Sequence, residues 1–195
     1  MVFPKGDMLK AIKQGDLAEI KRLVQTHGLY STPKLSKGCF LLAKALLCKQ
    51  RAIAQLLMDC GATTDCYLDK PAYQYSPLHI ACNLGYHEIV KLCLRRGADV
   101  NQKDDWNNTP LDYSRDAATF KLLLHNGAHL ESKHLHLFNS PSLSIILVDH
   151  MLDHGLLMNL DVDGNSALHI ACMRYCPIEC MKKLGRWFRS ESKEQ

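Results

Sequence analysis

The residues with the clearest potential for chemistry are cysteines near the carboxyl end of the chain. Cys172, Cys176 and Cys180 are spaced by four residues. His169 lies about one helical turn before Cys172, so one straight helix would carry the thiolate and imidazole ligands that zinc prefers. Pro177, however, favours the start of a new helix and would divide this spacing between two elements. The sequence therefore predicts no metal site and no cofactor.

Histidines are also dense in the middle of the chain, where His125, His129, His134 and His136 follow one another. Imidazole titrates near neutral pH and ligates metals, so such a run could form a pH-sensitive or metal-binding surface. Exposed histidines in a solvated helix end and loop are the simpler interpretation, which we adopt as the expectation.

Motifs typical of catalysis or calcium binding are incomplete. The sequence has no glycine-rich phosphate loop, no Gly-x-Ser-x-Gly and no paired His-Glu helix motif. Residues 161–165 begin like a calcium loop, but the glycine comes early and no closing glutamate follows. We expect a turn at this position, and a protein that is not an enzyme.

Composition indicates an ordinary folded protein. The chain has 195 residues, of which 47% are hydrophobic and 23% charged, which is typical of a globular domain. No apolar run reaches the roughly 20 residues that span a bilayer, so no membrane insertion is expected. Residues 1–7 lack the features of a secretory signal. If the natural protein starts here, we expect an intracellular protein, cytoplasmic, nuclear or both, whose nine cysteines are reduced and serve as small apolar residues.

Charge is concentrated at the amino end. The chain has a net charge of +4, and its first 60 residues have ten Lys and Arg against four Asp and Glu. A basic surface could attract an acidic partner or a nucleic-acid backbone. Because most such surfaces are only solvated, a nucleic-acid partner is not expected.

Glycines that could end helices recur through the chain about every 33 residues. An apolar-periodic stretch precedes each of them, and a residue after a helix often takes the left-handed conformation that glycine tolerates. The glycines are Gly28, Gly61, Gly97, Gly127, Gly155 and Gly185.

Two segments have nearly the same amino-acid sequence. Residues 76–82 read SPLHIAC and residues 166–172 read SALHIAC. The first is followed by Gly85 and then, at residues 97–101, by GADVN. This text resembles the ankyrin repeat, which implies an all-α solenoid of stacked helix-turn-helix units with β-hairpin fingers.

The resemblance extends over a single domain, residues 1–188, followed by a tail at 189–195 that we expect to be disordered. It implies six repeats, at about 5–35, 36–70, 71–105, 106–133, 134–162 and 163–188. The fourth repeat has lost about three residues relative to its neighbours, which predicts a shortened helix pair.

Several polar residues are placed to cap these helices. Asp16 precedes the second helix of the first unit, where its carboxylate can accept from the helix backbone. Ser76, Thr109 and Ser166 stand before helix starts, where a hydroxyl can cap the helix or bond to the histidine of the repeat. In the fourth unit Asp112 replaces that histidine.

The resemblance implies that partners bind on a concave surface made of the fingers and the first helix of each repeat. Trp106 lies in a polar stretch before the fourth repeat, and three tyrosines lie in a lengthened finger before the third. Aromatic residues dominate binding energy at interfaces, although the tyrosines would also suit packing within their own loop. The candidate partner-binding residues are Trp106, Tyr73, Tyr75, Tyr67, Asp105, Asn108, Tyr113, Arg115, Asn83 and Arg174.

Together these features predict a monomeric protein–protein interaction module, acting as an adaptor, a scaffold or a substrate-recognition part. The alternative is an autonomous inhibitor of a signalling or transcription factor that resembles the NF-κB inhibitors, including the case of a mimic encoded by a pathogen.

Overall fold

The computed structural model describes residues 5–27, 39–64, 75–131, 134, 141–154 and 177–191. The chain divides into two compact units, 1–115 and 116–195, with the division inside the fourth predicted repeat. Every regular element assigned in the described ranges is helical, in agreement with the all-α prediction.

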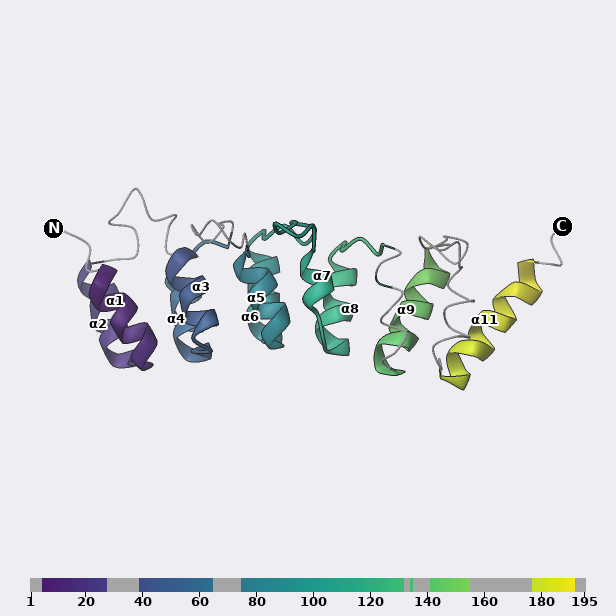
Figure 1. Ribbon diagram of the computed structural model, residues 1–195, viewed down its shortest axis with the longest axis horizontal. Coiled ribbons are helices and arrows are strands. Elements are labelled where there is room, and N and C mark those ends of the chain that lie inside the picture. Colours follow the sequence, from purple (N-terminus) through teal and green to yellow (C-terminus); the bar gives the residue numbers. More distant parts are fainter. Residues whose placement is uncertain are drawn as a thin grey trace. The chain divides into compact units, whose positions relative to one another are not determined.

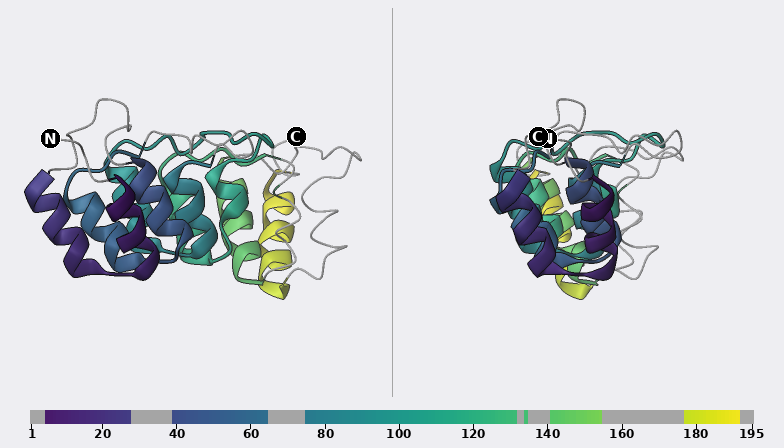
Figure 2. Two further views of the ribbon diagram at one scale, coloured as in Figure 1. Left: turned by 60° about the vertical axis from the view of Figure 1, so that its left-hand side comes forward. Right: turned by 90° about the vertical axis from the view of Figure 1, so that its left-hand side faces the viewer.

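The first unit consists of helix pairs joined by tight turns (Figures 1 and 2). Its first helices, α1, α3, α5 and α7, contact one another in succession, and its second helices, α2, α4 and α6, do the same. The bounds are α1 (Lys5–Gln14), α2 (Leu17–His27), α3 (Cys39–Leu47), α4 (Arg51–Asp59), α5 (Pro77–Leu84), α6 (His87–Arg95) and α7 (Pro110–Tyr113). This two-layer stack is the arrangement that a helical solenoid requires.

Apolar side chains fill the seams between these layers. Leu42 and Leu46 on α3, Leu57 on α4 and Leu78 on α5 are fully buried. Each such side chain contributes about 1.5–3 kcal/mol when it leaves water. A single helix pair cannot bury both of its faces, so the stability of the unit depends on neighbouring pairs.

The turn inside each pair uses a left-handed residue. Gly15 (φ +73°), Lys49 (φ +57°) and Gly85 (φ +65°) take this conformation at the ends of α1, α3 and α5. Two of the three positions therefore hold glycine, which the left-handed backbone favours. In the pair of α3 and α4 the position holds Lys49, whose Cβ is strained in this conformation.

Lys49→Gly is expected to stabilise the protein by about 0.5–1 kcal/mol. Relief of left-handed strain, about 1–2 kcal/mol, exceeds the entropy cost of a glycine, about 0.5–1 kcal/mol. Urea unfolding of the full chain measures the change. Lys49→Ala is the matched control, since it removes the charge and keeps the Cβ; equal stability of the two variants would contradict the strain assignment.

Glycines that end helices were predicted with mixed success. Gly61 (φ +91°), Gly97 (φ +82°) and Gly127 (φ +86°) have the expected left-handed backbone. Gly185 was predicted wrongly, because it lies inside α11 (Ile178–Glu191). A glycine in a helix costs only about 1 kcal/mol, which the packing of an amphipathic helix offsets. Gly28 and Gly155 lie outside the described residues.

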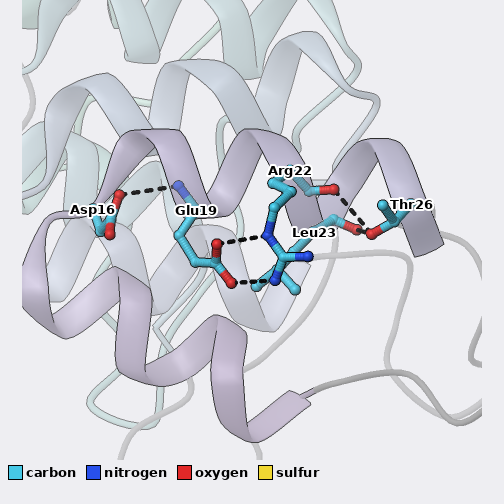
Figure 3. Close-up of polar contacts among 5 residues, drawn as sticks. All are labelled: Asp16, Glu19, Arg22, Leu23 and Thr26. Atoms are coloured by element: carbon cyan, nitrogen blue, oxygen red, sulfur yellow. Dashed lines mark hydrogen bonds and ion pairs between the residues drawn. The ribbon is translucent and has the colours of Figure 1, made fainter.

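The predicted cap at Asp16 is present (Figure 3). Asp16 Oδ1 accepts from the Glu19 N–H at 3.0 Å, and the Glu19 carboxylate accepts two bonds from Arg22, at 2.8 and 2.6 Å. Further along α2 the Thr26 hydroxyl donates to the carbonyls of Arg22 and Leu23. The bond from Arg22 lowers the pKa of Glu19. Because the Glu19–Arg22 pair is open to solvent, it orders the helix surface and adds little stability.

The second unit contains α8 (Ala117–His125), α9 (Pro141–Asp153) and α11, with α9 in contact with both others. Phe120 and Leu123 on α8, Leu147 on α9 and Leu184 on α11 are fully buried. An ion pair between Lys183 and Asp149 also joins α11 to α9. The helix α11 continues to Glu191, so residues 189–191, which were predicted to belong to a disordered tail, are helical; residues 192–195 are outside the described part.

The cysteines follow the prediction only in part. Cys82, Cys93 and Cys180 are buried and not disulfide-bonded, and burial raises the pKa of the Cys93 thiol to about 12, so they behave as small apolar residues. Cys39 is disulfide-bonded, which corrects the expectation that all nine are reduced. Cys172 and Cys176 lie outside the described ranges, whereas Cys180 follows Pro177 on α11 as predicted.

No helix in the described ranges has the length and apolarity needed to cross a membrane.

Candidate binding surface

The loop between α6 and α7, residues 96–109, is shaped by one carboxylate. Asp104 Oδ1 accepts from the backbone N–H groups of Trp106 and Asn108, both at 2.9 Å. The Asp104 N–H donates to the Asn108 carbonyl at 2.9 Å, which closes the tip of the loop. Asn107 takes a left-handed backbone (φ +63°), a conformation that asparagine tolerates. The described part of this loop has no strand.

The other oxygen of the same carboxylate bonds to Tyr113, which in turn bonds to Tyr75. Tyr113 Oη lies 2.6 Å from Asp104 Oδ2 and 3.0 Å from Tyr75 Oη. A carboxylate only accepts, so Tyr113 donates its proton to Asp104 and accepts from Tyr75. Burial, and then the bond to Asp104, raise the pKa of Tyr113, which keeps the phenol neutral. Asn108 Nδ2 donates to the same phenol oxygen at 3.3 Å.

The rings of Tyr75, His79, Trp106 and Tyr113 form what we call the aromatic cluster. Tyr75 lies at its centre, with its ring centroid 5.5 Å from that of Trp106 and 5.2 Å from that of Tyr113. The Tyr75–Tyr113 pair is T-shaped, a favourable arrangement of ring quadrupoles. Trp106 nevertheless keeps 49% of its surface exposed. The cluster thus contacts the indole through Tyr75 and leaves about half of the Trp106 surface open to solvent.

His79 connects α5 to the loop. Its Nδ1 accepts from the Ser76 N–H at 3.2 Å and lies 2.7 Å from Ser76 Oγ. Its Nε2 lies 3.3 Å from the Asn108 carbonyl, to which it donates. Both ring nitrogens are therefore used by a neutral imidazole, and burial lowers the pKa of His79. The predicted bond between Ser76 and the repeat histidine is confirmed.

In the fourth unit an aspartate takes over this role. Asp112 Oδ2 accepts from the Thr109 N–H at 2.7 Å and from the Thr109 hydroxyl at 2.9 Å. A carboxylate at the third helical position can reach back to the residue before the helix, which is the geometry of a capping box. The predicted capping position of Thr109 is confirmed, and Ser166 lies outside the described residues.

Acidification below pH 6.5 is expected to destabilise the protein through His79. Since its folded pKa is lower than the ordinary 6.5, the unfolded chain takes up a proton first. The associated stability is complete above pH 6.5 and is lost as pH falls toward the folded pKa, at up to about 1.4 kcal/mol per pH unit. Urea unfolding at several pH values, compared between wild type and His79→Asn, measures this. The free energy of unfolding of the His79→Asn variant should depend less steeply on pH than that of wild type. Equal slopes for the two proteins would refute the assignment to His79.

The structure brings part of the predicted partner-binding set together. Tyr75, Trp106, Asn108 and Tyr113 meet around Asp104. Three of the predicted contacts are exposed: Asp105, Asn83 near the end of α5 and Arg115 two residues after α7. Tyr67, Tyr73 and Arg174 lie outside the described residues.

Sequence reasoning missed Asp104. A local pattern could have indicated its role, since an aspartate that accepts from the backbone amides two and four residues ahead is typical of an Asx-type turn.

Comparison with known proteins agrees with this architecture. Residues 44–134 match the family model for ankyrin repeats (3 copies). Human protein phosphatase 1 regulatory subunit 27 is 30% identical over 111 residues, which cover 56% of this chain and 70% of that protein. The chain belongs to the ankyrin repeat family. The resemblance read from residues 76–101 is therefore confirmed.

Ankyrin repeat proteins from very different sources are also similar to the chain. The putative ankyrin repeat protein FPV031 of Fowlpox virus (strain NVSL) is 30% identical over 150 residues, covering 69% of this chain and 43% of that protein. A putative ankyrin repeat protein of Rickettsia bellii (strain RML369-C) is 42% identical over 59 residues, covering 28% of this chain and 25% of that protein. Similarity across such sources reflects the repeat itself and indicates no single partner.

Proposed function

We propose that the chain is a non-catalytic protein–protein interaction module that binds a partner protein or peptide on the concave side of its repeats. The half-exposed indole of Trp106 carries this proposal. A side chain that served the core would be buried, whereas this ring rests on Tyr75 and faces solvent.

The arrangement around Trp106 favours tight binding. Asp104 fixes the backbone on either side of the indole through its bonds to Trp106 and Asn108. A side chain held in place before binding loses less conformational entropy when a partner covers it. Tryptophan and tyrosine are also the residues most enriched in binding energy at interfaces. We infer that Trp106 is the central contact, with Tyr75 supporting it.

Polar residues would form the rim of this surface. Asp105, Asn83 and Arg115 are exposed, and polar rims exclude water around a central anchor. Tyr67, Tyr73 and Arg174 remain proposed contacts of neighbouring fingers and first helices. The finger at 96–109 is proposed to act as a hairpin, since the Asp104–Asn108 backbone bond draws its two sides together.

An adaptor is the role that the relatives support best. The human relative is named a regulatory subunit of protein phosphatase 1, so a phosphatase catalytic subunit is the first partner to test. We propose that the protein acts inside the cell as a monomer, without a nucleic-acid partner. The alternative, an inhibitor of a signalling or transcription factor, draws support from the similarity to a viral ankyrin repeat protein over 150 residues.

Affinity capture from lysate, followed by reconstitution with the purified candidate, tests the proposal. Wild-type chain is compared with the Trp106→Ala/Tyr75→Ala double variant, and a phosphatase 1 catalytic subunit is included as a defined candidate. The proposal requires a protein that binds wild type directly and the double variant much more weakly. If the captured partner binds wild type and the double variant with affinities that differ by less than twofold, the proposed binding surface is refuted.

A further inference from the structure

The second unit has a pocket that is separate from the aromatic cluster. Its volume is about 690 Å³, and both α8 and α9 supply its walls. Three histidines line it: His125 from α8, His150 from α9 and His154, the residue that follows α9. Nothing in the proposed binding surface accounts for this concentration of imidazoles.

Two of these histidines are placed as a chelating pair. His150 and His154 are four residues apart, and the His154 N–H donates to the His150 carbonyl at 3.1 Å. His154 therefore lies one turn beyond His150 at the end of α9, on the same side. Their ring centroids are 4.3 Å apart, at an interplanar angle of 49°. Rings tilted and spaced in this way can direct one nitrogen each toward a shared ion, and the pocket leaves room for that ion and for water.

The surroundings of the pair favour a cation. The pocket is lined by the last residues of both helices, His125 of α8 and Asp153 of α9, and helix carboxyl ends carry partial negative charge. Asp149 also lines the pocket but is paired with Lys183, so Asp153 is the carboxylate whose charge acts there. Lys121 is the one ammonium group in the lining.

We propose that His150 and His154 bind one divalent ion of the borderline class, such as Zn²⁺, in this pocket. Imidazole ligands select such ions over Mg²⁺ and Ca²⁺, which prefer oxygen. The described residues hold no group of three or more potential ligands arranged around one point. With two imidazoles as its protein ligands and water in the remaining positions, the site holds an exchangeable ion with modest affinity. The prediction of no metal site was based on the cysteines and on the histidines at 125–136, and it did not consider this pair.

Zinc titration of the full chain, followed by NMR of the histidine ring nitrogens, tests the proposal. A site-resolved signal is needed because free thiols such as Cys48 and Cys60 also bind zinc. The rings of His150 and His154 should shift together and saturate with one ion. Either His150→Ala or His154→Ala should weaken binding at least about tenfold, since even indirect partners of metal ligands are worth that much.

His129→Ala is the matched control, because it removes an exposed histidine of the same unit that does not line the pocket. Thermal melting without metal shows whether each variant still folds, and His154→Gln provides a conservative second variant near the helix end. Zinc shifts confined to cysteines, or binding that is the same in the His150 and His154 variants as in the His129 variant, would overturn the proposal. Neither outcome bears on the proposed function, whose central contacts, Trp106 and Tyr75, lie in the first unit.

Discussion

Trp106→Ala is expected to weaken partner binding by about 2–4 kcal/mol, or about 30- to 700-fold. The indole is 49% exposed in the free protein, so a partner gains most by covering it. Its support by Tyr75 at 5.5 Å and its fixed backbone mean that little ordering is needed on binding. Isothermal titration calorimetry or surface plasmon resonance with the captured partner gives the affinity directly.

Ile178→Ala is the matched control for this prediction. Ile178 is 73% exposed on α11 in the second unit, so its truncation removes a comparable apolar surface far from the aromatic cluster in sequence. It should leave affinity unchanged. Trp106→Ala should also keep the unfolding free energy within about 1 kcal/mol of wild type, because half-exposed side chains contribute less to the core. Affinity within twofold of wild type would show that the indole is not the anchor.

Asp104→Ala is expected to lower the free energy of unfolding by about 3 kcal/mol, because each donor left without its acceptor costs about 1–3 kcal/mol. Asp104 is 7% exposed and accepts from two backbone amides and from the Tyr113 hydroxyl. Without it these donors must find water or rearrange the loop. Urea unfolding of the full chain measures the loss, and the same variant should lower partner affinity because the indole is no longer held.

Asp105→Ala supplies the comparison for Asp104. It removes the adjacent carboxylate, which is exposed, and surface substitutions of this kind usually stay within about 0.5 kcal/mol. Asp104→Asn should lie between the two, since an amide oxygen replaces only some of the lost acceptors. Equal stability of the Asp104→Ala and Asp105→Ala variants would contradict the network.

Local spacing explains why much of the fold was predictable. Ser76 and Asp16 act on amides three residues ahead, so their roles are written in adjacent sequence. Likewise, the text shared by residues 76–82 and 166–172 identifies the repeat without any knowledge of its neighbours. The prediction of two helices in each repeat follows from the family that this shared sequence resembles.

The contacts that fix the site were harder to read because they join distant residues. Tyr75 and Tyr113 are 38 residues apart in sequence, and no local pattern predicts that their hydroxyls will bond to each other beside Asp104. Tyr75 was expected either to bind a partner or to pack on its own loop. In the structure it packs in the aromatic cluster, against the exposed indole of Trp106.

Two backbone conformations, at Lys49 and Gly185, also could not be predicted from the sequence. Lys49 occupies a left-handed position that glycine fills in the neighbouring pairs, and Gly185 lies inside a helix where a helix end was expected. In both cases tertiary packing overrides the intrinsic preference of the residue.

Hydroxyl-radical footprinting of the full chain, free and bound to its captured partner, tests the central claim most directly because it reports the exposure of individual side chains. The account predicts that oxidation of Trp106 is high in the free protein and falls sharply in the complex, with smaller protection at Tyr75. Trp106 that stays equally reactive, while side chains on α2, α4 and α6 become protected, would place the partner on the other layer and contradict the account.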